Sequence, residues 1–221
     1  MATIVITGAN RGIGLELARQ YAAEGHDVIR CMRGEDKADP LFGTTMALDV
    51  TDGQSVAKFA AALGEMPIDL LINNAGITGP AMQSSTEMDF EGFQSAIEAN
   101  VFGPLRVTQA LLPNLRKATG AKVAVISSRM GSFAAPQSGY VAYRASKAAV
   151  NKVFQCLASD LAGEGIAVTS LHPGWVRTDM GGAGADIDVE TSVSGIRKVL
   201  DDLDMGRTGR FYAYDGEELA W

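Results

Sequence analysis

The stretch that decides the fold opens the chain and reads Thr3-Ile4-Val5-Ile6-Thr7-Gly8-Ala9-Asn10-Arg11-Gly12-Ile13-Gly14. Its first five residues form a short β-branched run, which predicts a buried strand. An amphipathic helix is predicted from Leu15 to Glu24, and Gly25 ends it. A strand, a glycine-rich turn and a helix therefore follow one another directly.

The glycine-rich turn is suited to hold a phosphate group. Glycines allow a tight turn and a close approach of the backbone, and the N-terminus of the following helix attracts negative charge. The spacing is G-x-x-x-G-x-G, which differs from the more familiar G-x-G-x-x-G. The alternative is that the glycines serve the geometry of the loop alone. We predict that a dinucleotide binds through its pyrophosphate to this turn, at Gly8, Asn10, Arg11, Gly12, Ile13 and Gly14.

Strands and helices alternate along the rest of the chain. Further strands are predicted at residues 27–32, 44–48, 68–72, 122–126, 167–171 and 211–214. Helices are predicted from the capping-box sequence 51–54 to residue 63, and at 90–118, 143–161 and 188–203. Asn100 and Pro113 fall inside the second of these helices. The alternation predicts an α/β fold, a doubly wound parallel sheet, in a single domain over residues 1–221.

Charge and the few cysteines and histidines limit the classes of binding partner and site that are expected. The net charge of −7 argues against a nucleic-acid or anionic-membrane surface. Cys31 and Cys156 lie in apolar stretches and are expected to be reduced core residues of a cytoplasmic protein, since no run approaches membrane-spanning length. His26 and His172 lack metal-ligand company, so we expect structural roles for both and no metal site.

Tyr143 and Lys147 form the candidate catalytic pair. Four residues apart on a helix, the phenol and the ammonium group point from one face into the same site. A nearby cation stabilises the phenolate, which predicts a lowered tyrosine pKa and a general acid. Taken alone, the motif is weak, because a tyrosine and a lysine at this spacing usually belong to a solvated helix face.

Several motifs, in order, resemble the classical short-chain dehydrogenase/reductase family over essentially the whole chain. They are TGANRGIG at 7–14, Leu48-Asp49-Val50, NNAG at 73–76, Asn100, Ser128, Tyr143-x-x-x-Lys147 and Pro173-Gly174. The stretches 126–132 and 139–147 and the chain end, with Trp221, are most similar to the C-factor and sniffer-type carbonyl reductase branch. The resemblance implies a Rossmann-like sheet of about seven parallel strands with helices on both faces.

The resemblance also implies roles. Tyr143 would give its proton to a substrate carbonyl oxygen, Ser128 would hydrogen-bond the same oxygen, and Lys147 would hold the nicotinamide ribose. Asn100 would hold a water linked to Lys147, or would be a helix-kink residue with a local hydrogen bond. The remaining cofactor contacts are expected at Asp49, Val50, Asn74, Ala75, Gly76, Pro173, Gly174, Val176 and Thr178.

Three site assignments have a competing explanation in the sequence. Tyr140 faces Arg144 at the same spacing as the Tyr143 pair, but a bulky guanidinium suits the ribose less than an ammonium group, so Tyr143 is preferred. Ser127 and Ser128 alternate along a strand, and the family pattern favours Ser128. An apolar substrate pocket or ordinary core packing would explain Met130, Phe133, Tyr140, Trp175 and Met180 equally well.

The cofactor is predicted to be NADP(H). An NAD enzyme places a carboxylate at the end of its second strand, whereas here Met32 is followed by Arg33. Arg11 in the glycine turn would reach the same 2′-phosphate. Glu35 and Asp36 are the competing carboxylates, and Gly34 suggests a turn that carries them away.

The sequence thus predicts an NADPH-dependent reductase of ketones or aldehydes. The alternative is a C-factor-like signalling or regulatory protein that binds the nucleotide without a main redox role. A dehydratase or epimerase is disfavoured, since those relatives have another glycine spacing and a large C-terminal substrate region. A Ser128–His172 hydrolase lacks the G-x-S-x-G elbow. A homodimer is expected through the helices that carry Asn100 and Tyr143, although the branch also contains monomers.

Overall fold

A computed structural model describes residues 1–34, 42–134 and 137–221. Seven parallel strands form one sheet in the order β3-β2-β1-β4-β5-β6-β7. The strands are β1 (Thr3–Thr7), β2 (Asp27–Met32), β3 (Thr44–Ala47), β4 (Leu70–Asn73), β5 (Lys122–Ile126), β6 (Ala167–His172) and β7 (Arg210–Ala213). The helices are α1 (Gly12–Ala23), α2 (Gly53–Leu63), α3 (Phe90–Ile97), α4 (Gly103–Leu115), α5 (Val141–Leu161) and α6 (Val189–Asp201). The predicted fold class is confirmed.

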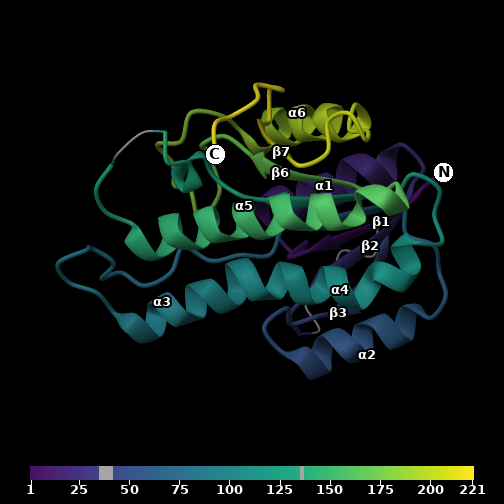
Figure 1. Ribbon diagram of the computed structural model, residues 1–221, viewed down its shortest axis with the longest axis horizontal. Helices are drawn as coiled ribbons and strands as arrows, with labels where there is room; N and C mark the ends of the chain where they lie inside the picture. Colours follow the sequence, from purple (N-terminus) through teal and green to yellow (C-terminus); the bar gives the residue numbers. More distant parts are fainter. Residues whose placement is uncertain (35–41, 135–136) are drawn as a thin grey trace.

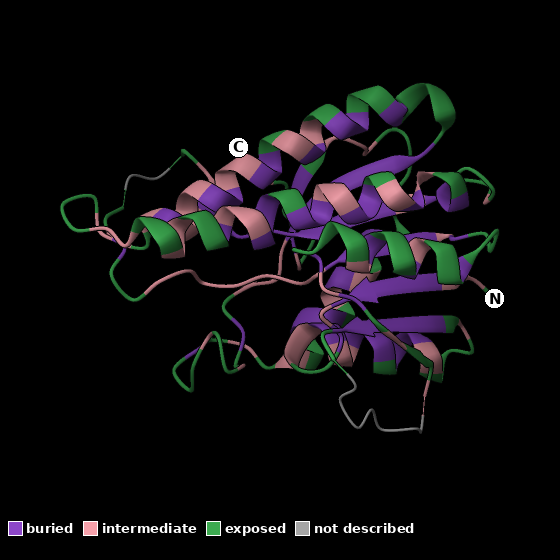
Figure 2. Cartoon of the chain, turned by 90° about the horizontal axis from the view of Figure 1, so that it is seen from below, coloured by how far each residue is buried: buried purple, intermediate pink, exposed green. Residues whose placement is uncertain are grey.

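Helices cover both faces of the sheet (Figure 1), because neighbouring strand residues point to opposite sides. Val5 of β1 packs into the cluster beneath α2, α4 and α5, while Ile4 and Ile6 pack into the cluster beneath α1 and α6. Figure 2 shows the strands buried between the two helical layers. Residues buried on both faces need no polar alternation, which is why the central strands β1, β4 and β5 read as largely apolar runs, whereas the edge strand β3 is mostly exposed.

The order of the strands fixes the place of the site. The chain runs outward from β1 to β3, then returns to the other side of β1 and continues through β4 to β7. The connections after β1 and β4 therefore diverge, and a crevice opens beyond the carboxyl ends of these two strands.

The model corrects several predicted boundaries. The helix after the turn begins at Gly12 rather than Leu15, and α2 begins with Asp52 as its cap, whose carboxylate accepts from the Gln54 amide. The capping-box interpretation was wrong because the Thr51 hydroxyl donates instead to Asp49. Cys31 is buried as expected, but Cys156 is exposed on α5.

The helix predicted at 90–118 is interrupted around Asn100. α3 passes into a π-helical turn, Glu98–Phe102, and α4 continues from it through Pro113 to Leu115. A π-helical turn inserts one residue into the helical repeat, and such turns are frequent at functional sites. Among the described residues, no helix is long and apolar enough to cross a membrane.

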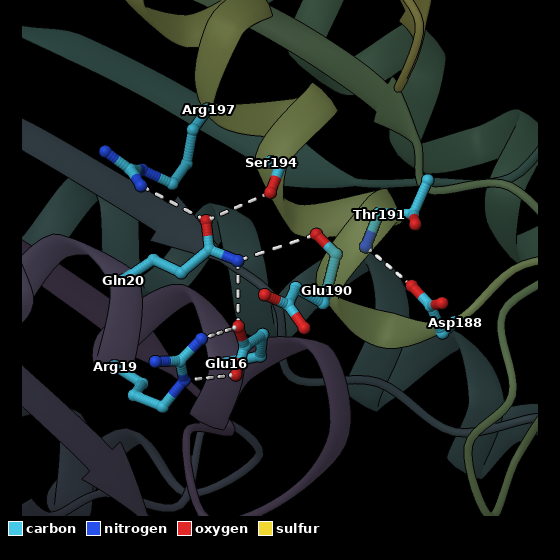
Figure 3. Close-up of polar contacts among 8 residues, drawn as sticks. All are labelled: Glu16, Arg19, Gln20, Asp188, Glu190, Thr191, Ser194 and Arg197. Atoms are coloured by element: carbon cyan, nitrogen blue, oxygen red, sulfur yellow. Dashed lines mark hydrogen bonds and ion pairs between the residues drawn. The ribbon is translucent and has the colours of Figure 1, made fainter.

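A polar network fastens α1 to α6 (Figure 3). Gln20 is buried, and its Oε1 accepts from Arg197 Nη1 at 3.1 Å and from the Ser194 hydroxyl at 3.4 Å. Its Nε2 donates to Glu16 Oε1 at 2.8 Å. The Arg197 guanidinium also lies 4.7 Å from the centre of the Tyr21 ring. One glutamine therefore joins polar groups of both helices above the apolar cluster.

Replacing Gln20 by alanine is expected to lower the free energy of unfolding by about 1–3 kcal/mol, because the partly buried Arg197 of α6 loses one acceptor and Glu16 of α1 loses a donor. The measurement is urea unfolding followed by circular dichroism. Arg19→Ala is the matched control, since the Arg19–Glu16 pair is exposed and is expected to contribute less than about 1 kcal/mol. Equal losses in the two variants would contradict the role given to Gln20.

Candidate active site

A cavity of about 360 Å³ lies at the carboxyl ends of β1 and β4. Fifteen of the predicted cofactor residues line it, namely Gly8, Asn10, Arg11, Gly12, Ile13, Arg33, Asp49, Val50, Asn74, Ala75, Gly76, Tyr143, Lys147, Pro173 and Thr178. Gly14, Gly174 and Val176 do not line it. Gly174 instead packs against Ile187 and Tyr214 with φ of +86°, and Val176 is buried.

The glycine turn forms one wall of the cavity, pressed against the chain that leaves β4. A β-carbon on Gly14 would lie 2.4 Å from both the Gly8 carbonyl oxygen and Asn74 Nδ2. Gly8 has φ of +65°, and a β-carbon there would lie 2.9 Å from the Ala75 Cα. Steric need thus explains these two glycines, and it also creates the wall that a phosphate would approach.

Hydrogen bonds hold this wall in place. The Thr7 hydroxyl oxygen accepts from the amides of Asn74 and Ala75, each at 3.0 Å. Asn74 Nδ2 donates to the carbonyl oxygens of Thr7 and Gly8, also at 3.0 Å. Sequence reasoning assigned no role to Thr7 beyond the strand, although a hydroxyl at the end of a buried strand is a signal for such a link.

Asn100 lies in the π-helical turn and is buried. Its Oδ1 accepts from the Ile77 amide at 2.8 Å, and its Nδ2 donates to the Ile77 carbonyl at 2.8 Å and to Ser146 Oγ at 2.9 Å. A β-carbon on Gly76 would lie 2.9 Å from Asn100 Oδ1 and 3.7 Å from Lys147 Nζ. Asn100 therefore joins the loop after β4 to α5, next to the lysine.

Tyr143 and Lys147 lie together in the first turns of α5. Lys147 Nζ is 5.6 Å from the centre of the Tyr143 ring and donates to the Ile126 carbonyl at 2.8 Å. Burial lowers the pKa of Lys147 to about 8. Burial also raises the pKa of Tyr143, and a hydrogen bond with Ser128 opposes this rise only in part. The sequence-based expectation of a lowered phenol pKa was thus wrong for the protein by itself, because desolvation outweighs the effect of the neighbouring groups.

Of the two adjacent serines, Ser128 is the one whose side chain lies close enough to Tyr143 to affect its pKa. It also caps the 3₁₀ turn Arg129–Gly131, where its Oγ accepts from the Met130 amide at 3.2 Å. Ser127 lines the cavity, but its hydroxyl is directed to the Lys147 carbonyl at 3.4 Å. The two side chains therefore point in different directions. Ser128 was expected to be the serine in the site, but it does not line the cavity and lies beside Tyr143 instead.

Two arginines lie at the other end of the cavity. Arg33 is exposed and close to Asp49. Partial burial would raise the pKa of Asp49, but hydrogen bonds from Thr51 and the Arg33 charge outweigh it and lower that pKa. Arg11 forms an exposed ion pair with Asp179 at 2.6 Å. Glu35 and Asp36, the competing carboxylates, lie outside the described residues.

The predicted substrate residues are largely on the surface. Phe133, Tyr140, Trp175 and Met180 are all exposed, so ordinary core packing does not explain them. Met180 lines the cavity, whereas Met130 is half-buried beside Ser128 and does not.

Neither histidine lines the cavity. His26 Nδ1 accepts from the Ala2 amide at 3.2 Å. Burial lowers the pKa of His172 to about 4, so its imidazole is neutral at pH 7. Within residues 1–34, 42–134 and 137–221 there is no cluster of three or more His, Cys, Asp or Glu side chains that suits a metal ion.

Comparison with known proteins identifies the class. Residues 2–186 match the family model described as short chain dehydrogenase, and the chain belongs to the short-chain dehydrogenase/reductase family. The C-signal of Myxococcus xanthus is 43% identical over 164 residues, which cover 74% of this chain and 98% of that protein. The 1-hydroxy-2-glutathionyl-2-methyl-3-butene dehydrogenase of Rhodococcus sp. (strain AD45) is 36% identical, with full coverage of both chains.

Solved structures place the chain further within the family. The NADPH-bound carbonyl reductase from chicken fatty liver superposes with a TM-score of 0.92 at 32% identity and covers 100% of this chain and 99% of its own. Carbonyl reductase Sniffer of D. melanogaster also gives a TM-score of 0.92, at 31% identity, with 100% coverage of both chains. The predicted branch, C-factor and sniffer-type carbonyl reductases, is confirmed.

Lys147→Met is expected to make the protein more stable than wild type at pH 7, by an amount that shrinks as pH rises from about 8 to 10.5. In the folded wild type the lysine loses its proton near pH 8, but in the unfolded chain only near 10.5. Between these values the unfolded state binds more protons, so wild-type stability rises with pH, by about 3 kcal/mol in all. Loss of the Nζ bond to Ile126 lowers the advantage of the variant at every pH.

Urea unfolding at several pH values measures this difference between variant and wild type. Lys152→Met, at an exposed position of α5, is the control and is expected to show no such pH dependence. A difference for Lys147→Met that stays constant from pH 7 to 10 would contradict the buried, destabilising charge.

Proposed function

We propose that the protein is an NADPH-dependent reductase that converts a ketone or aldehyde to an alcohol, with Tyr143 as general acid. The observation that carries this proposal is that Tyr143 and Lys147, with Ser128 beside Tyr143, share one cavity with the glycine turn and Arg33. The carbonyl reductases that superpose on this chain, one of them NADPH-bound, support it.

The residues present fit the cofactor. The glycine turn brings backbone close to the cavity, and Arg33 offers a cation at the end of β2 for a 2′-phosphate. Asp49 and Val50 would flank the adenine, and Asn74 with its neighbours would border the adenosine ribose. Lys147 would hold the nicotinamide ribose hydroxyls, with Thr178 at the carboxamide. When bound, the cofactor supplies a hydride to the substrate carbonyl carbon.

The chain supplies the proton and the orientation. The Ser128 hydroxyl donates to the carbonyl oxygen, and the Tyr143 hydroxyl transfers its proton to that oxygen as the C–H bond forms. Tyr143 is left as a phenolate, which the Lys147 ammonium group stabilises in a buried site where charge interactions are strong. Stabilisation that grows as charge develops favours the transition state over the bound substrate. Asn100 keeps the lysine and the loop after β4 together.

Tyr143→Phe removes only the hydroxyl, so kcat is expected to fall by roughly a hundred- to ten-thousand-fold, with NADPH affinity changed less than about twofold. The measurement is nicotinamide absorbance with a panel of aldehydes and ketones, together with NADPH binding by fluorescence. Tyr140→Phe is the matched control and is expected to be mild. A greater loss in Tyr140→Phe would reverse the assignment of the acid.

Wild type is expected to prefer NADPH over NADH by about ten- to a hundredfold, since one charge-assisted contact of Arg33 with the 2′-phosphate contributes about 1.5–3 kcal/mol and Arg11 is paired with Asp179. Arg33→Asp removes an attraction and adds repulsion, so it is expected to erase or reverse the preference. Comparing kcat/KM for the two cofactors decides this. Arg19→Asp makes the same charge change away from the cavity and is expected to leave the preference intact; equal use of both cofactors by wild type would refute the role of Arg33.

A second function is favoured by the 43% identity with a protein named C-signal. In this alternative the chain binds the nucleotide but acts in signalling or regulation. NADPH binding without reduction of any carbonyl in the panel would support it.

We also propose a cytoplasmic homodimer paired through α4 and α5. Phe90 and Phe102, beside this layer, are exposed apolar side chains.

A further inference from the structure

The N-terminus of α5 begins without the usual cap. The first turn of a helix leaves N–H groups without partners inside the helix, and Ser, Thr, Asp or Asn usually accepts from one of them. Here the cap residue is Tyr140, which adopts a left-handed conformation with φ of 52° and makes no side-chain cap bond. The first turn, which contains Tyr143, therefore depends on acceptors from elsewhere in the chain.

Gln83 supplies two of these acceptors. Its main-chain oxygen accepts from the Val141 amide at 2.9 Å, and its side-chain Oε1 accepts from the Tyr143 amide at 3.1 Å. The side chain is buried, and its Nε2 donates to the carbonyl oxygens of Thr78 at 3.0 Å and Pro80 at 2.8 Å. Gln83, which precedes Tyr143 by 60 residues in the sequence, thus links the first turn of α5 to the loop that follows β4.

That loop belongs to the site. Ile77 lines the cavity, and Asn100 bonds both its amide and its carbonyl. Gly79 neighbours both α5 and Gln83, since a β-carbon on it would lie 3.6 Å from that of Ala142 and 3.7 Å from Gln83 Oε1, at ordinary contact distance. The loop is consequently held at one end by Asn100 and at the other by Gln83, and both links lead to α5.

We propose that Gln83 is a positioning residue for Tyr143, which fixes the place of the phenol relative to the cavity through the backbone of the catalytic residue itself. The inference rests on the proposed function, in which Tyr143 is the acid. A general acid acts over a short range of distance, and a misplacement of about 1 Å costs on the order of a hundredfold in rate. Gln83 would also set the charge near the phenol, since its neutral amide accepts at the helix N-terminus.

Gln83→Met and Gln83→Glu separate these effects. Gln83→Met keeps the length of the side chain but removes the acceptor, so kcat is expected to fall by about ten- to a hundredfold with NADPH affinity within about twofold. Gln83→Glu keeps an acceptor for the Tyr143 amide and is expected to retain more activity than Gln83→Met, although both variants lose the donor to the Thr78 and Pro80 carbonyls. Its negative charge beside Tyr143 is expected to raise the phenol pKa, which moves the basic limb of the kcat–pH profile to higher pH.

The measurements are kcat, KM and the pH profile of each variant, with thermal unfolding to show that each is folded. Gln94→Glu is the matched control, because Gln94 is exposed on α3 and the same charge there is expected to leave the limb in place. A merely structural glutamine would change stability and KM without moving the pH limb or separating the two variants. An unchanged limb in Gln83→Glu, or equal kcat in Gln83→Met and wild type, would overturn the proposal.

Failure of the proposed function gives a different result. If wild type reduces no carbonyl compound, the reductase proposal is wrong, and ultraviolet titration of the Tyr143 phenol, with Tyr143→Phe as blank, still decides the role of Gln83. A higher phenol pKa in Gln83→Glu than in wild type and Gln94→Glu supports the positioning of Tyr143 by Gln83. Identical titrations in the three proteins refute it.

Discussion

The contact between the glycine turn and the chain leaving β4 is the constraint on which the site depends. No β-carbon fits between Gly14, the Gly8 carbonyl and Asn74, so the two connections meet at backbone distance. Parallel pairing of β1 with β4 brings them together, and the Thr7 hydroxyl and the Asn74 amide join them. The crevice begins where these connections diverge, so the place of the cofactor follows from how closely the sheet neighbours pack.

Burial of charge is the second constraint. Lys147 lies inside the protein, where an ammonium group is less stable than in water, and burial also disfavours the Tyr143 phenolate. Burial thus favours the neutral amine of Lys147 and the neutral phenol of Tyr143. An ammonium group and a phenolate side by side would nevertheless stabilise each other. In the proposed reductase, a charged Lys147, whose Nζ lies 5.6 Å from the centre of the Tyr143 ring, would therefore favour the phenolate that forms during the reaction.

The sequence was sufficient for the sheet and for most of the cavity. β1, β2 and β5 match their predicted bounds, because β-branched runs buried on both faces carry a strong local signal. The glycine spacing and the Tyr143–Lys147 spacing located two ends of the cavity for the same reason, since both are local patterns. The cap of α2 was misplaced by one residue, as Asp52 and Thr51 are both good caps and only the contact of Thr51 with Asp49 decides between them.

What the sequence did not reveal depends on contacts between distant residues. The π-helical turn has no pattern of its own; it exists because Asn100 must reach Ile77 and Ser146 at once, and an added residue in the helix turns its side chain toward both. Gln83 was missed because a glutamine in a loop carries no sequence signal for a contact with a distant helix. Its two acceptors matter because Tyr140, the cap residue of α5, makes no side-chain hydrogen bond to the first turn. The phenol, the lysine and the loop after β4 are thus placed by two amide side chains, Asn100 and Gln83, one on each side of Ile77–Pro80. If the protein is the reductase proposed above, a tyrosine fixed through its own backbone amide would keep its position independently of the exposed side chains of Phe133, Trp175 and Met180.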